Sequence, residues 1–185
     1  KLLKCPEIKI NVVDLNRERI NAWNNKDVTK IPIFEPGLSE IIKKVRGKNL
    51  FFSNDVDSAI SSADIIFICV NTPTKVKGLG AGRASDLKWV EACARQVALK
   101  AKGHTIVVEK STMPVKTAET IKIILQSSQP KSCDEKKLKT FSVLSNPEFL
   151  AEGTAIKDLE DPDRVLIGGD DEKAIEKLAK IYRKW

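Results

Sequence analysis

The sequence predicts an α/β fold with a doubly wound, mainly parallel sheet. Short apolar runs alternate along the chain with stretches of helical spacing, which is typical of parallel strands joined by crossover helices. Several runs end in polar or proline-containing turns, as expected where strands reach the carboxyl edge of such a sheet. Hydrophobic residues form 42% and charged residues 31% of the 185 residues, which fits one globular domain with a substantial core.

The expected strands are short apolar runs bounded by Asn, Asp, Ser, Gly or Pro. In chain order they cover 8–13, 50–52, 65–70, 105–108, 141–144 and 164–167. The expected helices carry apolar residues at helical spacing and begin at capping residues or after proline. They cover 17–23, 38–45, 55–62, 86–101, 115–126, 154–159 and 172–185. Asn16 and Asn54 are the expected N-caps of the first and third helices, and 32–36, 71–85 and 131–139 are expected to be irregular.

The most informative segment follows the expected strand at 141–144. Asn146-Pro147 ends this strand, because proline has no N–H for the ladder and restricts the residue before it. Glu148 and Glu152 then lie around a turn at the carboxyl end of the strand. Ligands of open α/β sheets bind at that end, so the segment is a candidate site.

Asp14 indicates a second candidate site and a Rossmann-like arrangement. It ends the apolar run at 12–13, as does the acid that binds a ribose about 20 residues after a GxGxxG fingerprint. Only 13 residues precede it, so we expect the fold to be truncated at the N-terminus, with residues 1–5 ending the first crossover helix. Gly78-x-Gly80-x-Gly82 lies in a loop and is expected to be mobile rather than to bind phosphate.

Eight blocks along the chain resemble one known family. They are VVDLNRERINAW (12–23), IPIFEPGL (31–38), RGKNLFFS (46–53), VNTPTK (70–75), GLGAGRASDLK (78–88), EKSTMPVKTAE (109–119), SNPEFLAEG (145–153) and DPDRVLIGG (161–169). In this order they are similar to the nucleotide-sugar dehydrogenases, the UDP-glucose/GDP-mannose dehydrogenase family. The insert at 78–88 resembles the eukaryotic UDP-glucose type.

The resemblance implies an oxidoreductase that uses NAD to oxidise UDP-glucose to UDP-glucuronate in two steps. Residues 1–185 would be a partial NAD-binding domain, without the central and nucleotide-sugar-binding domains, which carry the nucleophilic cysteine of the family. We therefore expect this chain alone to be inactive. The whole protein is expected to be a cytoplasmic homo-oligomer. Alternatives are an inactive nucleotide-binding or subunit-interaction module, a relative that acts on another sugar, and a flavodoxin-like binding protein.

The resemblance also implies roles for individual residues. The expected cofactor-binding residues are Asp14, Arg19, Val70, Asn71, Thr72, Pro73, Thr74, Ser111, Thr112 and Glu152. The expected substrate-binding residues are Glu148, Phe149, Leu150, Ala151 and Glu152. Glu148 and Thr112 are the expected catalytic residues. A carboxylate at Asp14 would accept hydrogen bonds from ribose hydroxyls and repel a 2′-phosphate, which favours NAD over NADP. Asp14 could equally begin a helix, and Ser111 and Thr112 could cap one.

Other classes of function are disfavoured by composition. The net charge of +7 favours anionic partners, but its basic residues are interleaved with acids and lack the aromatic pattern of a nucleic-acid surface. The sequence has no membrane-length apolar run. With His104 as the only histidine and no cysteine cluster, we expect no metal site. Cys69 and Cys93 are expected to be core thiols. Trp23, Trp89 and Trp185 are expected to pack against the protein from helices.

Overall fold

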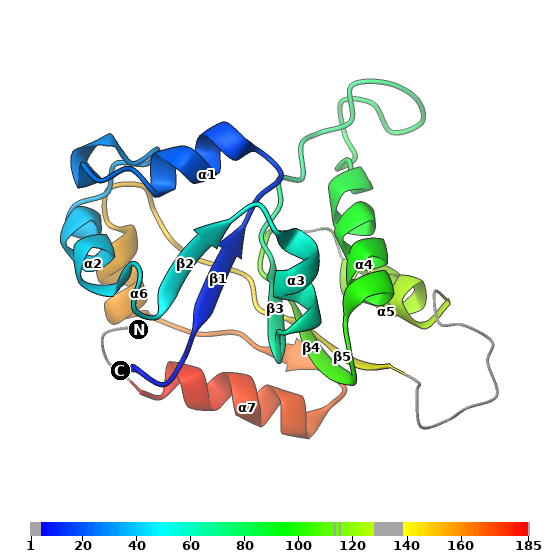
Figure 1. Ribbon diagram of the computed structural model, residues 1–185. Coiled ribbons are helices and arrows are strands. Elements are labelled where there is room, and N and C mark those ends of the chain that lie inside the picture. Colours follow the sequence, from blue (N-terminus) through cyan, green and yellow to red (C-terminus); the bar gives the residue numbers. More distant parts are fainter. Residues whose placement is uncertain (1–4, 113, 115, 128–138, 185) are drawn as a thin grey trace. The chain divides into compact units, whose positions relative to one another are not determined.

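The computed structural model describes residues 5–112, 114, 116–127 and 139–184 (Figure 1). Its described residues form two compact units. Unit 1 contains residues 5–59, 149–165 and 180–184, and unit 2 contains 60–148 and 166–179. Two of the boundaries fall within helices, α3 (Val56–Ser61) and α7 (Glu172–Tyr182), and the other two lie between Glu148 and Phe149 and between Val165 and Leu166. The sequence-based expectation of one partial domain stays a prediction.

Unit 1 is built around a parallel pair of strands. β1 (Ile10–Val13) pairs with β2 (Leu50–Ser53), with Ile10 opposite Leu50. Its complete helices are α1 (Arg17–Trp23), the 3-10 helix η1 (Val28–Lys30), α2 (Leu38–Val45) and α6 (Ala155–Glu160). The chain therefore alternates strand and helix here, as the sequence predicts, with η1 as an additional turn.

The core of unit 1 lies between α2 and β2. Ile42 and Val45 on α2 are buried against Leu50, and partly buried residues that include Trp23 and Phe52 surround them. The rings of Trp23 and Phe52 stack with their centroids 5.0 Å apart, so the expected packing role of Trp23 is confirmed. This core fixes the start of β2 against α2, and Leu50 at that start pairs with Ile10 at the start of β1.

Unit 2 contains the larger sheet. β3 (Ile65–Ile68), β4 (His104–Glu109) and β5 (Thr140–Ser145) are parallel, and β6 (Gly168–Gly169) pairs with β5 in the antiparallel direction. Its complete helices are α4 (Lys88–Lys100) and α5 (Thr117–Ser127). The sequence predicts the three parallel strands to within two residues at each end, and the mainly parallel sheet is confirmed.

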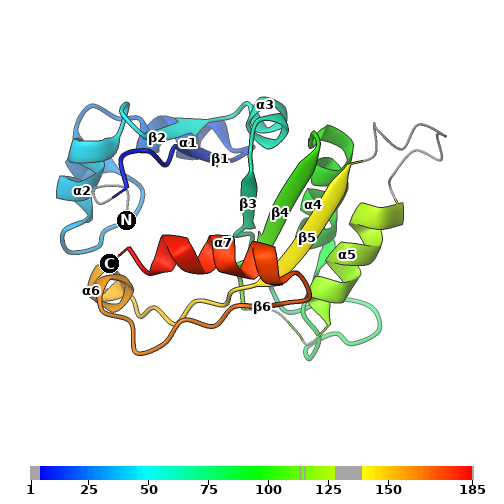
Figure 2. The same ribbon diagram turned by 90° about the horizontal axis from the view of Figure 1, so that it is seen from below.

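β4 is the central strand, and it is buried from Thr105 to Glu109. A strand covered on both faces needs a nearly continuous apolar run, which the Ile-Val-Val sequence supplies. Figures 1 and 2 show α4 and α5 side by side on one face of this sheet, while the first part of α7 lies on the other face. The doubly wound arrangement expected from the sequence is therefore present in unit 2.

Three local predictions are wrong. The expected strand at 164–167 is not a strand, because pairing with β5 begins only at Gly168; the Leu166 carbonyl instead accepts a 2.7 Å hydrogen bond from Asn146 Nδ2. Trp89 is 51% exposed rather than packed. Asn54 does not cap α3: its amide donates to the Asp14 carbonyl, and Asp55 Oδ1 accepts from the Ser58 N–H.

Several expectations fall outside the described residues. These concern residues 1–4, the first residue of the helix expected at 115–126, residues 131–138 and Trp185. Within the described ranges, no helix is both long and apolar enough to cross a membrane. The same residues contain no group of His, Cys, Asp and Glu side chains that could hold a metal ion.

Candidate functional site

The carboxyl ends of β3, β4 and β5 bring three sequence segments together in unit 2. Parallel strands end at the same edge of a sheet, so the residues that follow them become neighbours. They line a cavity of about 310 Å³. The lining residues are Cys69, Val70, Asn71, Thr72, Lys110, Ser111, Thr112 and Glu148. Six of these eight were predicted as site residues from the sequence: Val70, Asn71, Thr72, Ser111, Thr112 and Glu148.

Hydrogen bonds between the segments fix this cavity. Ser111 Oγ donates to the Val70 carbonyl at 2.9 Å, and Thr72 Oγ1 donates to the Thr112 carbonyl at 3.3 Å. The Lys110 N–H donates to the Ile68 carbonyl at 3.2 Å. The Ser111 hydroxyl thus joins the β3 and β4 segments rather than capping α5, which begins only at Thr117.

Lys110 and Cys69 are the two cavity residues that sequence reasoning missed. Lys110 is half-buried, and burial lowers the pKa of its ammonium, while Glu148 and Cys69 pull that pKa upward. Glu148 therefore lies near enough to Lys110 for electrostatic attraction inside the cavity. The signal was available, because Lys110 lies two residues after the strand expected at 105–108 and directly before the predicted site residues Ser111 and Thr112.

The expectation that Cys69 is a core thiol is wrong. β3 ends at Ile68, so Cys69 lies beyond the strand and the residue is exposed. Its thiol is still sufficiently surrounded that burial, followed by the nearby Glu148 charge, raises its pKa to about 11; Lys110 acts in the opposite direction. The thiol is therefore neutral at physiological pH and a poor nucleophile. Cys93, on α4, is half-buried.

Glu109 lies directly before Lys110, and its carboxyl group is buried. The residue is 5% exposed, and burial raises the pKa of its carboxyl group, against the lowering effect of a hydrogen bond with Ser145. Glu109 is not among the residues that line the cavity. The ionised form of Glu109 therefore lowers the stability of the folded state, and its carboxyl group does not take part in the cavity.

Glu109→Gln is expected to stabilise the protein at neutral pH. The folded-state pKa of Glu109 lies above its ordinary value of 4.5, so wild-type stability declines as the pH rises from 4.5 through the folded-state pKa. Glutamine does not ionise, so the variant does not lose stability in this pH range. The gain in free energy of unfolding over wild type should be complete above the folded-state pKa of Glu109 and should disappear below about pH 4.5. Urea unfolding between pH 4 and 8 measures it. Glu119→Gln, an exposed control on α5, should give no gain, and an equal advantage of Glu109→Gln at every pH would contradict the assignment.

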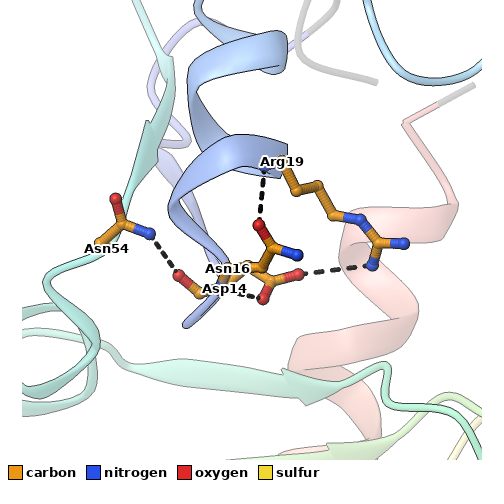
Figure 3. A network of polar contacts seen from close by, with 4 residues as sticks. All are labelled: Asp14, Asn16, Arg19 and Asn54. Carbon is orange, nitrogen blue, oxygen red and sulfur yellow. Dashed lines mark hydrogen bonds and ion pairs between the residues drawn. The ribbon is translucent and has the colours of Figure 1, made fainter.

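Asp14 forms a separate polar cluster at the carboxyl end of β1, in unit 1 (Figure 3). Asp14 Oδ1 accepts from the Asn16 N–H at 2.8 Å, and Oδ2 lies 3.5 Å from Arg19 Nη1. Asn16 Oδ1 accepts from the Arg19 N–H at 3.0 Å, which confirms Asn16 as the N-cap of α1. Asn54 Nδ2 donates to the Asp14 carbonyl at 2.7 Å and joins the ends of β1 and β2.

This cluster fits a ribose. A carboxylate has about four acceptor positions; the Asn16 N–H occupies one of them, and Arg19 Nη1 lies within hydrogen-bond distance of another. The Asp14 side chain is 34% exposed, so the remaining positions are open to hydroxyl donors from outside. Arg19 is exposed and turned toward Asp14, which makes it a neighbour of any ligand held there. The helix-start and ribose-binding interpretations of Asp14 are therefore compatible.

Residues 149–153 form an exposed loop in unit 1. The Arg164 guanidinium lies 4.5 Å from the centroid of the Phe149 ring, a cation–π contact. The Ala151 N–H donates to Asp158 Oδ2 at 3.1 Å, and this hydrogen bond is the main reason why the pKa of Asp158 lies below its usual value. Leu150 and Glu152 are exposed, and their predicted ligand contacts stay predictions.

Pro73 and Thr74 are the two predicted site residues after β3 that do not line the cavity. They begin an arm in which Thr74 forms an antiparallel bridge with Ser85, and the Pro73 carbonyl accepts from the Asp86 N–H at 2.6 Å. Gly78 and Gly82 within the arm have φ angles of 78° and 72°, which favour glycine. The arm is thus an organised turn at the start of α4.

Residues 2–185 match the model of the UDP-glucose/GDP-mannose dehydrogenase family, NAD binding domain. The chain belongs to this family. It is 53% identical over 185 residues to UDP-glucose 6-dehydrogenase from Bos taurus and 54% identical over 187 residues to UDP-glucose 6-dehydrogenase 1 from Arabidopsis thaliana. These matches cover 98% and 99% of the chain, but only 36% and 37% of the relatives, so the chain spans little more than a third of their length.

Solved structures of the family agree with the fold. GDP-mannose dehydrogenase from Pseudomonas aeruginosa, in a ternary complex, is 30% identical with a TM-score of 0.79 over 98% of this chain and 40% of that chain. UDP-glucose dehydrogenase from Pyrobaculum islandicum is also 30% identical, with a TM-score of 0.70 over 95% of this chain and 44% of that chain. The family membership and the Rossmann-like fold class expected from the sequence are therefore confirmed, and NAD is the cofactor of the matched domain.

Proposed function

We propose that the protein containing this chain oxidises the C6 alcohol of UDP-glucose to a carboxylate in two NAD-dependent steps. The observation that carries the proposal is the position of Glu148, which shares a cavity with Lys110 and Thr112 at the carboxyl edge of a parallel sheet. Family membership and the UDP-glucose 6-dehydrogenases among the relatives support the choice of reaction. NAD, when bound, supplies the hydride acceptor for each oxidation.

Asp14 has the role of holding the adenosine ribose of the cofactor. Its free carboxylate positions accept hydrogen bonds from the two ribose hydroxyls, and its negative charge disfavours a 2′-phosphate. Arg19 holds Asp14 in place from the first turn of α1. In unit 2, Asn71, Thr72 and Ser111 line the cavity, and we assign them to the cofactor as well.

We assign Glu148 the role of general base in the hydrolysis of an acyl intermediate, the thioester formed between the oxidised C6 and the cysteine nucleophile of the family; water adds to the thioester and the cysteine leaves as a thiolate. Its carboxylate takes a proton from a water held in the cavity, where the Thr112 residue can supply a second contact. Lys110 lies beside Glu148 in this cavity: burial lowers the pKa of its ammonium, and the nearby Glu148 carboxylate raises it. Cys69 lies in the same cavity, but its pKa of about 11 keeps it protonated, so we assign it no nucleophilic role.

The complete gene product should reduce NAD when UDP-glucose is supplied, with two NADH formed per sugar oxidised. UDP-N-acetylmannosamine and GDP-mannose, the substrates named for other family members, should give rates at least about tenfold lower, which corresponds to ~1.4 kcal/mol of discrimination. NADH absorbance and chromatography of the sugar product measure both. A single NADH per sugar, or a preference for GDP-mannose, would contradict the proposed reaction.

A further inference from the structure

The segment 31–38, one of the blocks singled out in the sequence, contacts the loop that follows Glu148. The carboxylate of Glu35 accepts two backbone hydrogen bonds from this region: Gly153 N–H to Oε2 at 2.9 Å and Ala155 N–H to Oε1 at 2.8 Å. The partners lie 118 and 120 residues away in the sequence. All three residues belong to unit 1.

These bonds give acceptors to backbone N–H groups in the loop and at the start of α6. The first N–H groups of a helix have no partner inside the helix, and the N-cap Thr154 makes no side-chain capping bond. Glu35 supplies the missing acceptor from outside, with both of its oxygens engaged. Hydrogen bonds to a charged acceptor are about twice as strong as neutral ones. The carboxylate thus fixes the backbone on both sides of Thr154.

Glu35 is itself held in a rigid turn. Its carbonyl accepts from the Leu38 N–H at 3.0 Å, and Pro36 restricts the backbone of the turn. Gly37 adopts a φ of 82°, and a Cβ at this position would lie 3.8 Å from Ile156 Cδ1 on α6. The turn at 35–38 therefore packs directly against α6, so Glu35 has little freedom to release the loop.

The hydrogen bonds divide the loop amides into two groups. The N–H groups of Ala151 and Gly153 are used, by Asp158 and Glu35 respectively. Within the part of the chain that the structure describes, the N–H groups of Leu150 and Glu152 make no such bond. Tethering alternate residues keeps the intervening donors exposed, and exposed amide donors are suited to phosphate or hydroxyl oxygens.

We propose that Glu35 is a positioning residue, which holds the backbone of residues 149–153 in the conformation that binds the nucleotide sugar. The inference rests on the proposed function, in which this loop contacts the substrate. Glu35 touches neither substrate nor cofactor; it acts through Gly153 and Ala155. Its loss should therefore affect binding of the sugar nucleotide more than binding of NAD.

The test uses Glu35→Gln in the complete gene product. The amide retains one acceptor but presents N–H donors to a backbone N–H, so one of the two bonds is lost. The KM for UDP-glucose should rise about tenfold, while the KM for NAD should change less than about threefold. Hydrogen exchange should become faster at 151–155 and remain unchanged in α2. Glu35→Asp keeps the charge, so its KM for UDP-glucose should lie between those of Glu35→Gln and wild type. Glu40→Gln, an exposed control on α2, should behave as wild type.

Unchanged hydrogen exchange at 151–155 in Glu35→Gln would overturn the role of Glu35, and so would faster exchange with a wild-type KM for UDP-glucose. An equal rise in both KM values would also overturn it, because a general structural defect gives that result. Failure of the proposed function has a different signature. In that case the wild-type protein itself would not turn over UDP-glucose, whereas the exchange experiment would still report whether Glu35 holds the loop.

Discussion

Glu148→Gln is expected to reduce turnover of the complete gene product by ~10²–10⁴-fold, the usual contribution of a general base. Glutamine has the size of glutamate but cannot take a proton from water. If the base acts in hydrolysis, the acyl intermediate should accumulate as a covalent sugar–enzyme adduct, which intact-protein mass spectrometry would detect. The dissociation constant of UDP-glucose from the free enzyme should change much less than turnover, because the side chain keeps its volume in the cavity.

Glu160→Gln is a suitable control for this experiment, since Glu160 is an exposed carboxylate at the end of α6. It should leave turnover unchanged. Wild-type turnover in Glu148→Gln, with no adduct, would show that Glu148 is only a loop acid. A slow variant without an adduct would move its role from hydrolysis to an earlier step.

Asp14→Ser is expected to narrow the preference for NAD over NADP. The substitution removes a charge that repels the 2′-phosphate, and it leaves Arg19, now without its 3.5 Å partner, beside the cofactor. A close-range charge effect at a partly solvated site is worth ~1–4 kcal/mol, or roughly one to three decades in the ratio of the two kcat/KM values. Most of the change in this ratio should come from a higher KM for NAD and a lower KM for NADP. Steady-state kinetics with both cofactors measure it.

Glu18→Gln provides the matched control, because Glu18 is an exposed acid in the first turn of the same helix. If both variants shift the ratio equally, the effect comes from general charge rather than from Asp14. If neither variant shifts it, Asp14 does not face the ribose, and the assignment of the β1–α1 segment to the cofactor is wrong.

The sequence predicted those features that depend on local patterns. β4 is buried on both faces, so its Ile-Val-Val run could be assigned directly. The cavity could be anticipated because polar residues follow predicted parallel strands, and Thr72, Thr112 and Glu148 do meet there. Asn16 caps α1 through contacts within three residues, a distance that sequence patterns describe well.

The errors arose where tertiary contacts override a local pattern. The apolar residues at 165–167 resemble a strand, but the Asn146 side chain binds the Leu166 carbonyl, and pairing begins only at Gly168. An apolar run also made the predicted strand at 65–70 two residues longer than β3. Cys69 was therefore wrongly expected to be a core thiol. The contact between Glu35 and Gly153 could not be predicted, because sequence patterns describe neighbouring residues and these two lie far apart in the chain.

Unit 1 is assembled from separate stretches of the sequence, and this affects the order in which the chain folds. Its described residues come from three separate stretches, 5–59, 149–165 and 180–184, whereas 60–148 of unit 2 is continuous. During synthesis β3, β4 and β5 can pair once residue 145 has emerged, but Glu35 must wait for Gly153 and Ala155. Closing a loop of this length is entropically costly before the contact forms. The loop at 149–153 is therefore expected to order after the sheet of unit 2, in one of the last steps of folding.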